Sequence, residues 1–556
     1  MQLLLIGGLN LNDPFTLGEQ ELAVALNADF RQKGVVRSRN GRSSVYTSQG
    51  TTLIGMADTD VYSVGSYIYH NGVALGTGIT GATALGVAEL YNTNNEVLLL
   101  SAQNNYKVDG SSVTLWGIAA PTVAPTVSAA AGGGMTVGTY YYKYTYARYV
   151  SGVLVHESNP SPVSASVATS GGNLQVSFTG TAPTDGQVTH LNVYRTLVGG
   201  ASGGVSFFFD QSITLPTVTA TSSNTDTQLG TLVETDNDPP PSTGLNAIAG
   251  PGAFNVIFVA AGNTVYYSKP RRPESFPADN YSQVGVPSQT IMGMVDWGGL
   301  MFLLTTTTIY YLQGTDPASF YPVKTQASRG LVSRQGAVAT DQGIIYVAYD
   351  GIYVFNGQSE LKLTGAKVDS LFRGETINDV EPINLDALDA TWLVYFNSKL
   401  MFGYPIAGNT QPTKVLVFDL EEKKWSIYDY NLTLLSAYVD ETNKRLLAGD
   451  SAGNIWQLET GTSDGGSAFT FKVRSREVSG LAVTSPGFIR HDVTNVGGET
   501  IYARLLSKGV VVHTTTLTDS TNYKRRVIGP QSYDSLQFEL ETSTDSRVIV
   551  GAVELL

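Results

Sequence analysis

The chain has 556 residues, of which 42% are apolar and 15% charged, so it can fill several hydrophobic cores and is not disordered in bulk. It has no cysteine and five histidines, which excludes disulfides, thiolate metal sites and cysteine nucleophiles and leaves few ligands for histidine-based metal chemistry. Its net charge of −13 has the wrong sign for a protein that grips nucleic-acid phosphates over its whole surface.

Residues 1–50 are predicted to form an N-terminal arm with one short helix. The apolar run at residues 3–6 is too short for a membrane span and lacks the basic region of a signal peptide, so we expect a protein made and kept in a cytoplasm. Between residues 17 and 30, Leu22, Ala25 and Leu26 recur at the spacing of a narrow helical face.

Two basic clusters stand out against the acidic composition. The first consists of Arg31, Lys33, Arg37, Arg39 and Arg42, and the second of Lys524, Arg525 and Arg526. Phosphate binding is one interpretation of the first cluster. We favour docking of the arm on an acidic partner surface, because no aromatic residues interleave with the basic ones. Both clusters are therefore candidates for contacts with partners or subunits.

Most of the remaining chain consists of short runs of Val, Ile, Thr, Tyr and Phe separated by Gly, Asn, Asp and Pro, which predicts an all-β protein. A weak pattern recurs, in which a strand with an aromatic or aliphatic second position ends on glycine. The best copies are at residues 67–72, 105–110, 309–314 and 352–357. Neighbouring copies and their related strands are about 40 residues apart, a period typical of the four-stranded blades of a β-propeller.

Residues 51–117 and 242–480 therefore predict a propeller of about six blades, although residues 381–431 fit the period poorly. More apolar strands lie upstream of most copies, as at residues 299–306 and 343–350, and suit the inner part of a blade. A pair of β-sandwiches would also explain the short strands, but it predicts no such period.

Residues 118–241 differ in character and are bounded by linkers rich in proline and glycine. Within them, Tyr140, Tyr142, Tyr144 and Tyr146 alternate along one strand and predict a single buried face. We interpret this segment as a fibronectin-like or immunoglobulin-like β-sandwich inserted into a propeller loop. Residues 481–556 predict a second, C-terminal β-sandwich.

Matches to catalytic motifs are weak in this context. The GxGxxG match at residues 76–81 lies in glycine-rich hairpin sequence rather than in a βαβ unit, and the GxSxG matches around Ser202 and Ser451 lie between strands. Glu234, Asp236 and Asp238 alternate as some calcium ligands do, but they lack the turn glycine and the closing glutamate. We expect a solvated linker there and no catalytic, metal or cofactor site.

Several passages together resemble one family. The opening GGLNLNDP and the following ALNADFRQKGVVRSRNGRSSV, with Asn27, Asp29, Gly34, Arg39 and Gly41, resemble the N-terminal region of bacteriophage tail nozzle proteins of the tail tubular protein B type. The passages RGLVSRQG and DGIYVFNG are similar to propeller blades of phage tail and virion proteins. HESNPSPVSASV and LNVYRT look like the fibronectin-type insert of the same group. The resemblance lies in the order of these motifs.

The resemblance implies a non-enzymatic structural protein of the virion tail, assembled in the cytoplasm of the host bacterium. It implies a homohexameric ring bound to an adaptor ring and other tail proteins, including a tail fibre or spike. Such a ring retains double-stranded DNA and then conducts it during ejection without specific binding, and acidic chains would let the duplex slide. The alternatives are a glycan-binding or glycan-cleaving β-propeller protein and a bacterial adhesin.

Overall fold

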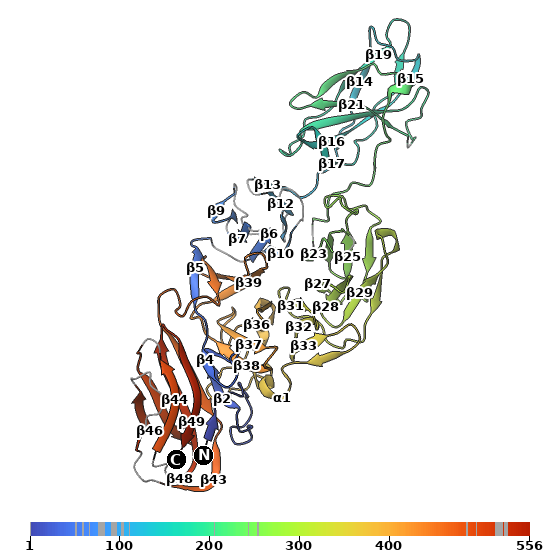
Figure 1. Cartoon of the computed structure of the whole chain (residues 1–556). Coiled ribbons are helices and arrows are strands. Elements are labelled where there is room, and N and C mark those ends of the chain that lie inside the picture. The colour runs from blue at the N-terminus through green and yellow to red at the C-terminus, as the bar shows by residue number, and fades with distance from the viewer. Residues whose placement is uncertain are drawn as a thin grey trace. The chain divides into compact units, whose positions relative to one another are not determined.

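The computed structural model describes residues 2–49, 53–57, 60–65, 67–75, 84–89, 97–101, 105–109, 112–204, 206–242, 244–252, 255–484, 488–495, 498–517, 526–527 and 532–555. The chain is all-β, as predicted (Figure 1). It divides into two compact units, one formed by residues 1–86, 289–311 and 323–556 and the other by residues 87–288 and 312–322. In the described part of the chain, no helix is both long and apolar enough to cross a membrane.

Among the described residues, seven four-stranded groups have the up-and-down strand order of a propeller blade, and we call them blade-like sheets. The first two are β6–β9 (Leu53–Ala57, Asp60–Val64, Ile68–His70, Val73–Ala74) and β10–β13 (Ala84–Glu89, Val97–Ser101, Tyr106–Asp109, Ser112–Leu115). The next two are β23–β26 (Leu245–Ala249, Phe258–Ala261, Thr264–Tyr267, Tyr281–Gln283) and β27–β30 (Ile291–Trp297, Leu300–Thr305, Ile309–Gln313, Tyr321–Lys324).

The fifth and sixth are β31–β34 (Ala337–Thr340, Gly343–Ala348, Gly351–Phe355, Glu360–Lys362) and β35–β38 (Trp392–Phe396, Lys399–Tyr404, Lys414–Asp419, Lys424–Tyr428). The last consists of β39 (Leu434–Asp440), β40 (Arg445–Asp450), β41 (Ile455–Leu458) and β5 (Arg42–Tyr46). The second strand of most of these sheets is buried along its length, for example β32, which is the environment predicted for the apolar strands.

The described part of the chain has one more blade-like sheet than the six or so predicted, and residues 381–431, which fitted the period poorly, contain the complete sheet β35–β38. Residues 365–390 precede it and contain the short helix α1 (Gly365–Val368) and two 3-10 helices (Asp369–Arg373 and Leu385–Ala390). This helical insertion lengthens the step between the fifth and sixth sheets, so the repeat is out of phase there.

The blade-like sheets of the first unit meet through their first strands. β27 lies against β31, β31 against β35, β35 against β39, and β39 against β6. Figure 1 shows the strands β31–β33 next to β36–β38. β39 contacts β6, and β5 pairs with β41. Within this unit, these contacts join the first blade-like sheet in the chain to the last one.

Residues 17–30 do not form the predicted helix. Leu22–Leu26 is strand β2 and Ala28–Asp29 is strand β3. β2 lies between two strands, parallel to β38 and antiparallel to β42 (Phe469–Ser475), and four of its five residues are buried. A strand that is buried on both faces does not alternate between polar and apolar residues. The apolar residues of β2 therefore also fit the spacing of a helical face.

The inserted module is a β-sandwich, as predicted, and its strands lie within residues 126–222. One group of strands contains β14 (Thr126–Ala130), β19 (Gln175–Thr179) and β22 (Thr219–Ser222), with the pair β15 (Gly138–Tyr140) and β18 (Val167–Thr169) beside it. The other sheet has the order β17 (Val153–Glu157), β16 (Tyr142–Val150), β20 (His190–Arg195) and β21 (Phe208–Thr214). Tyr142 and Tyr144 of β16 pack with Phe178 of β19 in the core between them.

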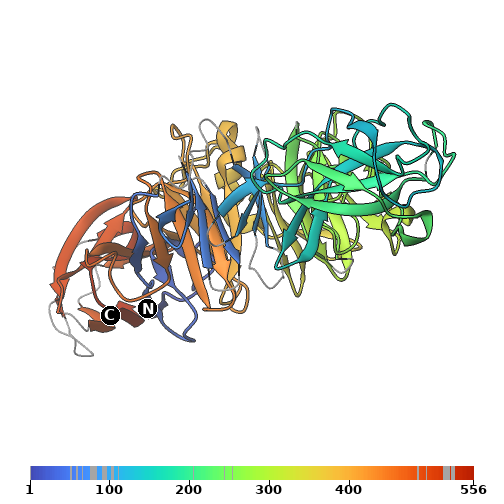
Figure 2. The ribbon, with the colours of Figure 1, turned by 90° about the horizontal axis from the view of Figure 1, so that it is seen from above.

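The C-terminal sandwich begins at β42, before the predicted boundary at residue 481. Its remaining strands are β43 (Val478–Thr484), β44 (Phe488–Asn495), β45 (Ile501–Ser507), β46 (Val510–Leu517), β47 (Arg526–Val527), β48 (Ser532–Thr544) and β49 (Val548–Leu555). The N-terminal residues are part of this sandwich and do not form an arm, because β1 (Gln2–Leu4) and β4 (Val36–Ser38) both pair with β49. The two termini accordingly lie side by side in Figures 1 and 2.

Candidate functional site

Asp29 is the centre of a buried ion-pair cluster in the first unit. Its Oδ2 atom lies 3.1 Å from Lys399 Nζ, 3.2 Å from Arg37 and 3.3 Å from Arg31. The side chains of Asp29 and Lys399 are almost completely buried. Burial alone would raise the pKa of Asp29, but Lys399, Arg31 and Arg37 outweigh it and hold the pKa well below its ordinary value. The cluster fastens β3 and β4 to strand β36.

Glu459, which follows β41, extends this cluster to the last blade-like sheet. Lys399 Nζ lies 2.7 Å from Glu459 Oε2 and donates to the Tyr428 hydroxyl at 2.8 Å. Arg31 lies 3.4 Å from the same glutamate oxygen, and the Tyr430 hydroxyl donates to Glu459 Oε1 at 3.3 Å. A buried ammonium is stable only when carboxylates and hydroxyls surround it in this way.

Arg39 is fully buried beside this cluster, so the prediction that it contacts a partner is wrong. Its guanidinium donates to both carboxylate oxygens of Asp464 at 2.9 and 2.7 Å and to Asn27 Oδ1 at 2.8 Å. The guanidinium carbon also lies 4.1 Å from the centre of the Tyr430 ring and 4.0 Å from that of Phe469. Arginine suits this position because its planar fork pairs with a carboxylate while its faces stack on aromatic rings.

The other predicted contact residues are placed differently. Arg42 lies over the Trp456 ring at 3.9 Å, whereas Lys33 is exposed. Lys524 and Arg525 lie outside the described residues, and Arg526 begins strand β47. The first basic cluster is therefore mainly internal. The sequence did not predict the partners of this region, because Lys399, Glu459 and Asp464 are more than 360 residues away in the chain from Asp29, Arg31 and Arg39, which they contact.

Gly41 allows β5 to enter the last blade-like sheet, and its replacement by alanine is expected to be destabilising. A Cβ atom at Gly41 would lie 1.9 Å from the carbonyl oxygen of Ser463, which accepts the Arg42 N–H at 3.0 Å. We expect Gly41→Ala to cost about 1–3 kcal/mol, as overpacking does elsewhere. The measurement is the thermal midpoint of unfolding. Gly186→Ala is the control, because a Cβ there meets nothing within 4 Å, and an equal loss in both variants would contradict this reason.

The motifs considered for catalysis occupy turns where the structure describes them. Ser451 is exposed between β40 and β41, where Asp450 accepts hydrogen bonds from the backbone N–H groups of Ala452 and Asn454. Ser202 is exposed in a turn of the inserted module, and the GxGxxG match at residues 76–81 lies outside the described residues. Neither described serine lies on the strand–turn–helix elbow that a nucleophile of this type needs.

The acidic residues near position 236 lie in an exposed segment without helix or strand, as predicted for a solvated linker, and two of them form ion pairs there. Glu234 pairs with Lys269 at 3.1 Å and with Arg272 at 2.5 Å, and Lys269 also pairs with Asp236 at 2.5 Å. Asp238 accepts a hydrogen bond from Asn159 at 2.7 Å. Within the ranges that the structure describes, no group of three or more His, Asp or Glu side chains is arranged to hold a metal ion.

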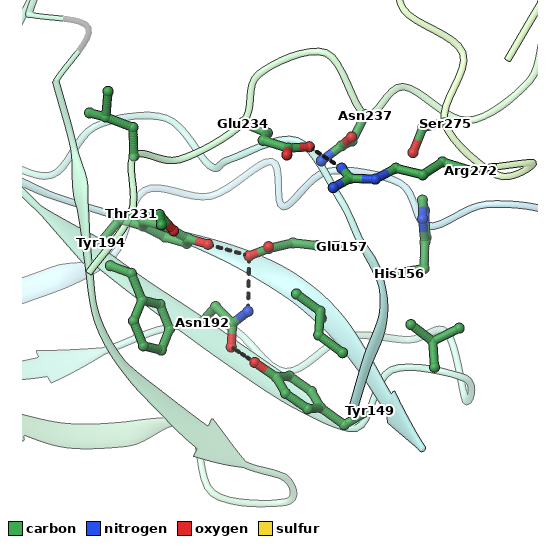
Figure 3. Close-up of a pocket in the computed structure, with 14 residues that line it drawn as sticks. Tyr149, His156, Glu157, Asn192, Tyr194, Thr231, Glu234, Asn237, Arg272 and Ser275 are labelled. Atoms are coloured by element: carbon green, nitrogen blue, oxygen red, sulfur yellow. Dashed lines mark hydrogen bonds and ion pairs between the residues drawn. The ribbon is translucent and has the colours of Figure 1, made fainter. Parts of the chain in front are cut away.

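A cleft of about 520 Å³ opens on the inserted module, in the second unit (Figure 3). Its floor is the outer face of the sheet β17–β16–β20–β21, and its cover is formed by residues 231–237 and the loop at residues 272–275. The lining residues are Tyr149, Leu154, Val155, His156, Glu157, Asn192, Tyr194, Phe209, Thr231, Leu232, Glu234, Asn237, Arg272 and Ser275. Sequence reasoning missed this cleft, although His156 and Glu157 begin the HESNPSP passage.

Comparisons with known proteins find no matching family model and no matching curated protein. Among solved structures, BBS1N in complex with ARL6DN is 10% identical with a TM-score of 0.29, covering 76% of this chain and 98% of that chain. AztD from Citrobacter koseri is 11% identical with a TM-score of 0.28, covering 72% and 93%. An exo-beta-1,3-galactanase from Phanerochaete chrysosporium is 11% identical with a TM-score of 0.22, covering 56% and 95%. Likenesses of this size say nothing about function.

Proposed function

We propose that this chain is a structural protein of the tail of a short-tailed bacteriophage, in which copies form a homo-oligomeric ring bound to an adaptor ring. The ring retains the genomic DNA and then conducts it to the host cell. The order of the sequence motifs supports this family, and the proposed role is non-enzymatic. Tail fibres or a spike would attach to the same assembly.

The observation that carries the proposal is the internal neutralisation of the first basic cluster in an acidic chain. Arg31, Arg37 and Arg39 face buried carboxylates, while the whole chain keeps a net charge of −13. A conduit for duplex DNA must not hold its cargo by phosphate contacts, whose strength depends on free lysine and arginine side chains. An acidic protein in which Arg31, Arg37 and Arg39 pair with its own carboxylates meets that need.

The way in which the two ends of the chain are joined also suits a component that must resist mechanical load. β1 and β4 pair with β49, and β2 bridges β38 and β42. Neither end can therefore detach without breaking strand pairs. A protein on the path of an ejected genome benefits from such a closed arrangement.

Electron microscopy of tailed particles tests the proposal. Antibodies against the inserted module, residues 118–241, are expected to decorate the distal end of the tail, and reconstruction of the particle is expected to show a ring of six copies. In parallel, the full chain is expected to leave a fluorescent 30-base-pair duplex unbound at physiological ionic strength. Absence of the protein from tails, or tight binding of the duplex, would overturn the proposal.

A further inference from the structure

The cleft on the inserted module has a polar network on a sheet face that lies outside the module's core. Glu157 Oε1 accepts hydrogen bonds from the Tyr194 hydroxyl at 2.7 Å, from Asn192 Nδ2 at 3.0 Å and from the Thr145 hydroxyl. Asn192 Oδ1 in turn accepts the Tyr149 hydroxyl at 3.2 Å and the Ser212 hydroxyl at 2.5 Å. Figure 3 shows the contacts that connect Tyr194, Glu157, Asn192 and Tyr149. Such a network fixes each side chain in one orientation.

Two polar groups of the cleft lack a full set of partners. Glu157 Oε2 receives no hydrogen bond from the described residues, because all three donors bind Oε1. His156 lines the cleft and is only 6% exposed, yet its Nε2 atom has no hydrogen-bond partner among the described residues. Burial lowers the pKa of His156, more than the nearby Glu274 raises it, so the ring is neutral at pH 7. An unpartnered nitrogen at this depth is costly unless a ligand or water binds it.

The cover of the cleft is held in place before any ligand binds. The backbone N–H of Phe209 donates to the Thr231 carbonyl at 2.8 Å, which ties the cover to β21. On the opposite side, Glu234 pairs with Arg272, and the Asn237 N–H donates to Asn159 Oδ1 at 2.7 Å. Preorganisation of this kind reduces the free-energy cost of ordering a site on binding.

The composition of the lining selects the class of ligand. The carboxylate of Glu157 disfavours an anion, whereas Glu234 and Arg272 neutralise each other in their ion pair. Tyr149 and Phe209, which are partly exposed, offer apolar ring surface. A neutral ligand with several hydroxyl groups fits best, because its hydroxyls can donate to Glu157 Oε2 while its apolar faces pack on these rings. The volume is within the range of small-molecule sites.

From this geometry we propose that the cleft on the inserted module binds a neutral sugar unit, with Glu157 as the hydrogen-bonding group and the aromatic side chains as apolar contacts. The proposal does not depend on the tail assembly, because the cleft lies within a single chain. It concerns binding only and assigns no cleavage to these residues.

Saturation-transfer NMR of the full chain tests the proposal with D-glucose, D-galactose, N-acetyl-D-glucosamine, L-rhamnose and lactose as probes. We expect at least one of these sugars to bind with a Kd of ~1 mM or lower. Glu157→Gln keeps an acceptor for Tyr194 but replaces the free oxygen by a donor, so it is expected to weaken binding at least tenfold. Leu232→Trp fills the mouth of the cleft and is expected to abolish binding, since Leu232 is 53% exposed there.

Matched control variants lie in the first unit. Glu360 accepts hydrogen bonds from the Tyr346 hydroxyl at 2.8 Å and from Ser328, much as Glu157 accepts from Tyr194 and Thr145, and Leu361 is 65% exposed. Glu360→Gln and Leu361→Trp are expected to leave sugar binding unchanged. The proposal is overturned if none of the five sugars binds the unmodified chain, or if binding persists unchanged in both cleft variants.

Discussion

Replacing Asp29 by asparagine is expected to speed amide hydrogen exchange more than a hundredfold in residues 22–46 and 469–475. The side chain of Asp29 is completely buried and faces Lys399, Arg31 and Arg37. Removing one partner of a buried ion pair costs about 3–5 kcal/mol, because the other charge is left without compensation. These peptides cover the strands that the cluster fastens, and mass spectrometry reports the free energy of their local opening.

The matched control for this variant is Asp534→Asn. Asp534 pairs with Lys508 at 2.8 Å, but both side chains are mostly exposed, so no measurable change in exchange is expected. An equal acceleration of hydrogen exchange in the two variants would show that burial of the Asp29 cluster is not what stabilises this region.

The same cluster predicts how stability depends on pH. The pKa of Asp29 is lowered in the folded chain, whereas in the unfolded chain it lies near 3.9. The ionised carboxylate therefore stabilises the fold fully above about pH 4, and this contribution is lost as the pH falls through the lower, folded-state pKa. Below pH 4 the unmodified chain should lose this contribution progressively. The difference in the free energy of unfolding between the unmodified chain and Asp29→Asn should then become smaller.

Removal of residues 1–46 is expected to prevent the chain from folding to a soluble monomer. The deletion removes β5, whose Val45 and Tyr46 pack on Leu447 and Ile455 of the last blade-like sheet. It also removes β2, which leaves the facing edges of β38 and β42 unpaired. Long unpaired strand edges with apolar neighbours promote aggregation. Size-exclusion chromatography and circular dichroism measure the outcome.

The control is a larger deletion that should do less harm. Replacing residues 121–236 by a short glycine–serine linker removes the inserted module, whose core contains only its own residues. We expect the shortened chain to stay soluble and rich in β-structure. A soluble, folded chain without residues 1–46 would contradict the conclusion that the N-terminal strands are integral to the first unit.

The predictable parts of this structure are those with a local signal. The alternation of Tyr140, Tyr142 and Tyr144 identified the buried face of the inserted sandwich, because side chains alternate between the two faces of a strand. Strands such as β32 stood out as apolar runs because they are covered on both sides. Repetition of such strands at a period of about 40 residues indicated blade-like sheets.

The sequence by itself determined the all-β class, the blade-like repeat and the inserted sandwich, since these depend on the periodicity of neighbouring residues. Only the tertiary structure decided that residues 22–26 form a strand, that Arg39 and Asp29 are buried, and that a cleft lies over β20. Each of these depends on partners that are distant in sequence, such as Lys399, Asp464 and Arg272. The burial of a charge is decided by the carboxylate or ring that meets it in space, which local periodicity does not encode.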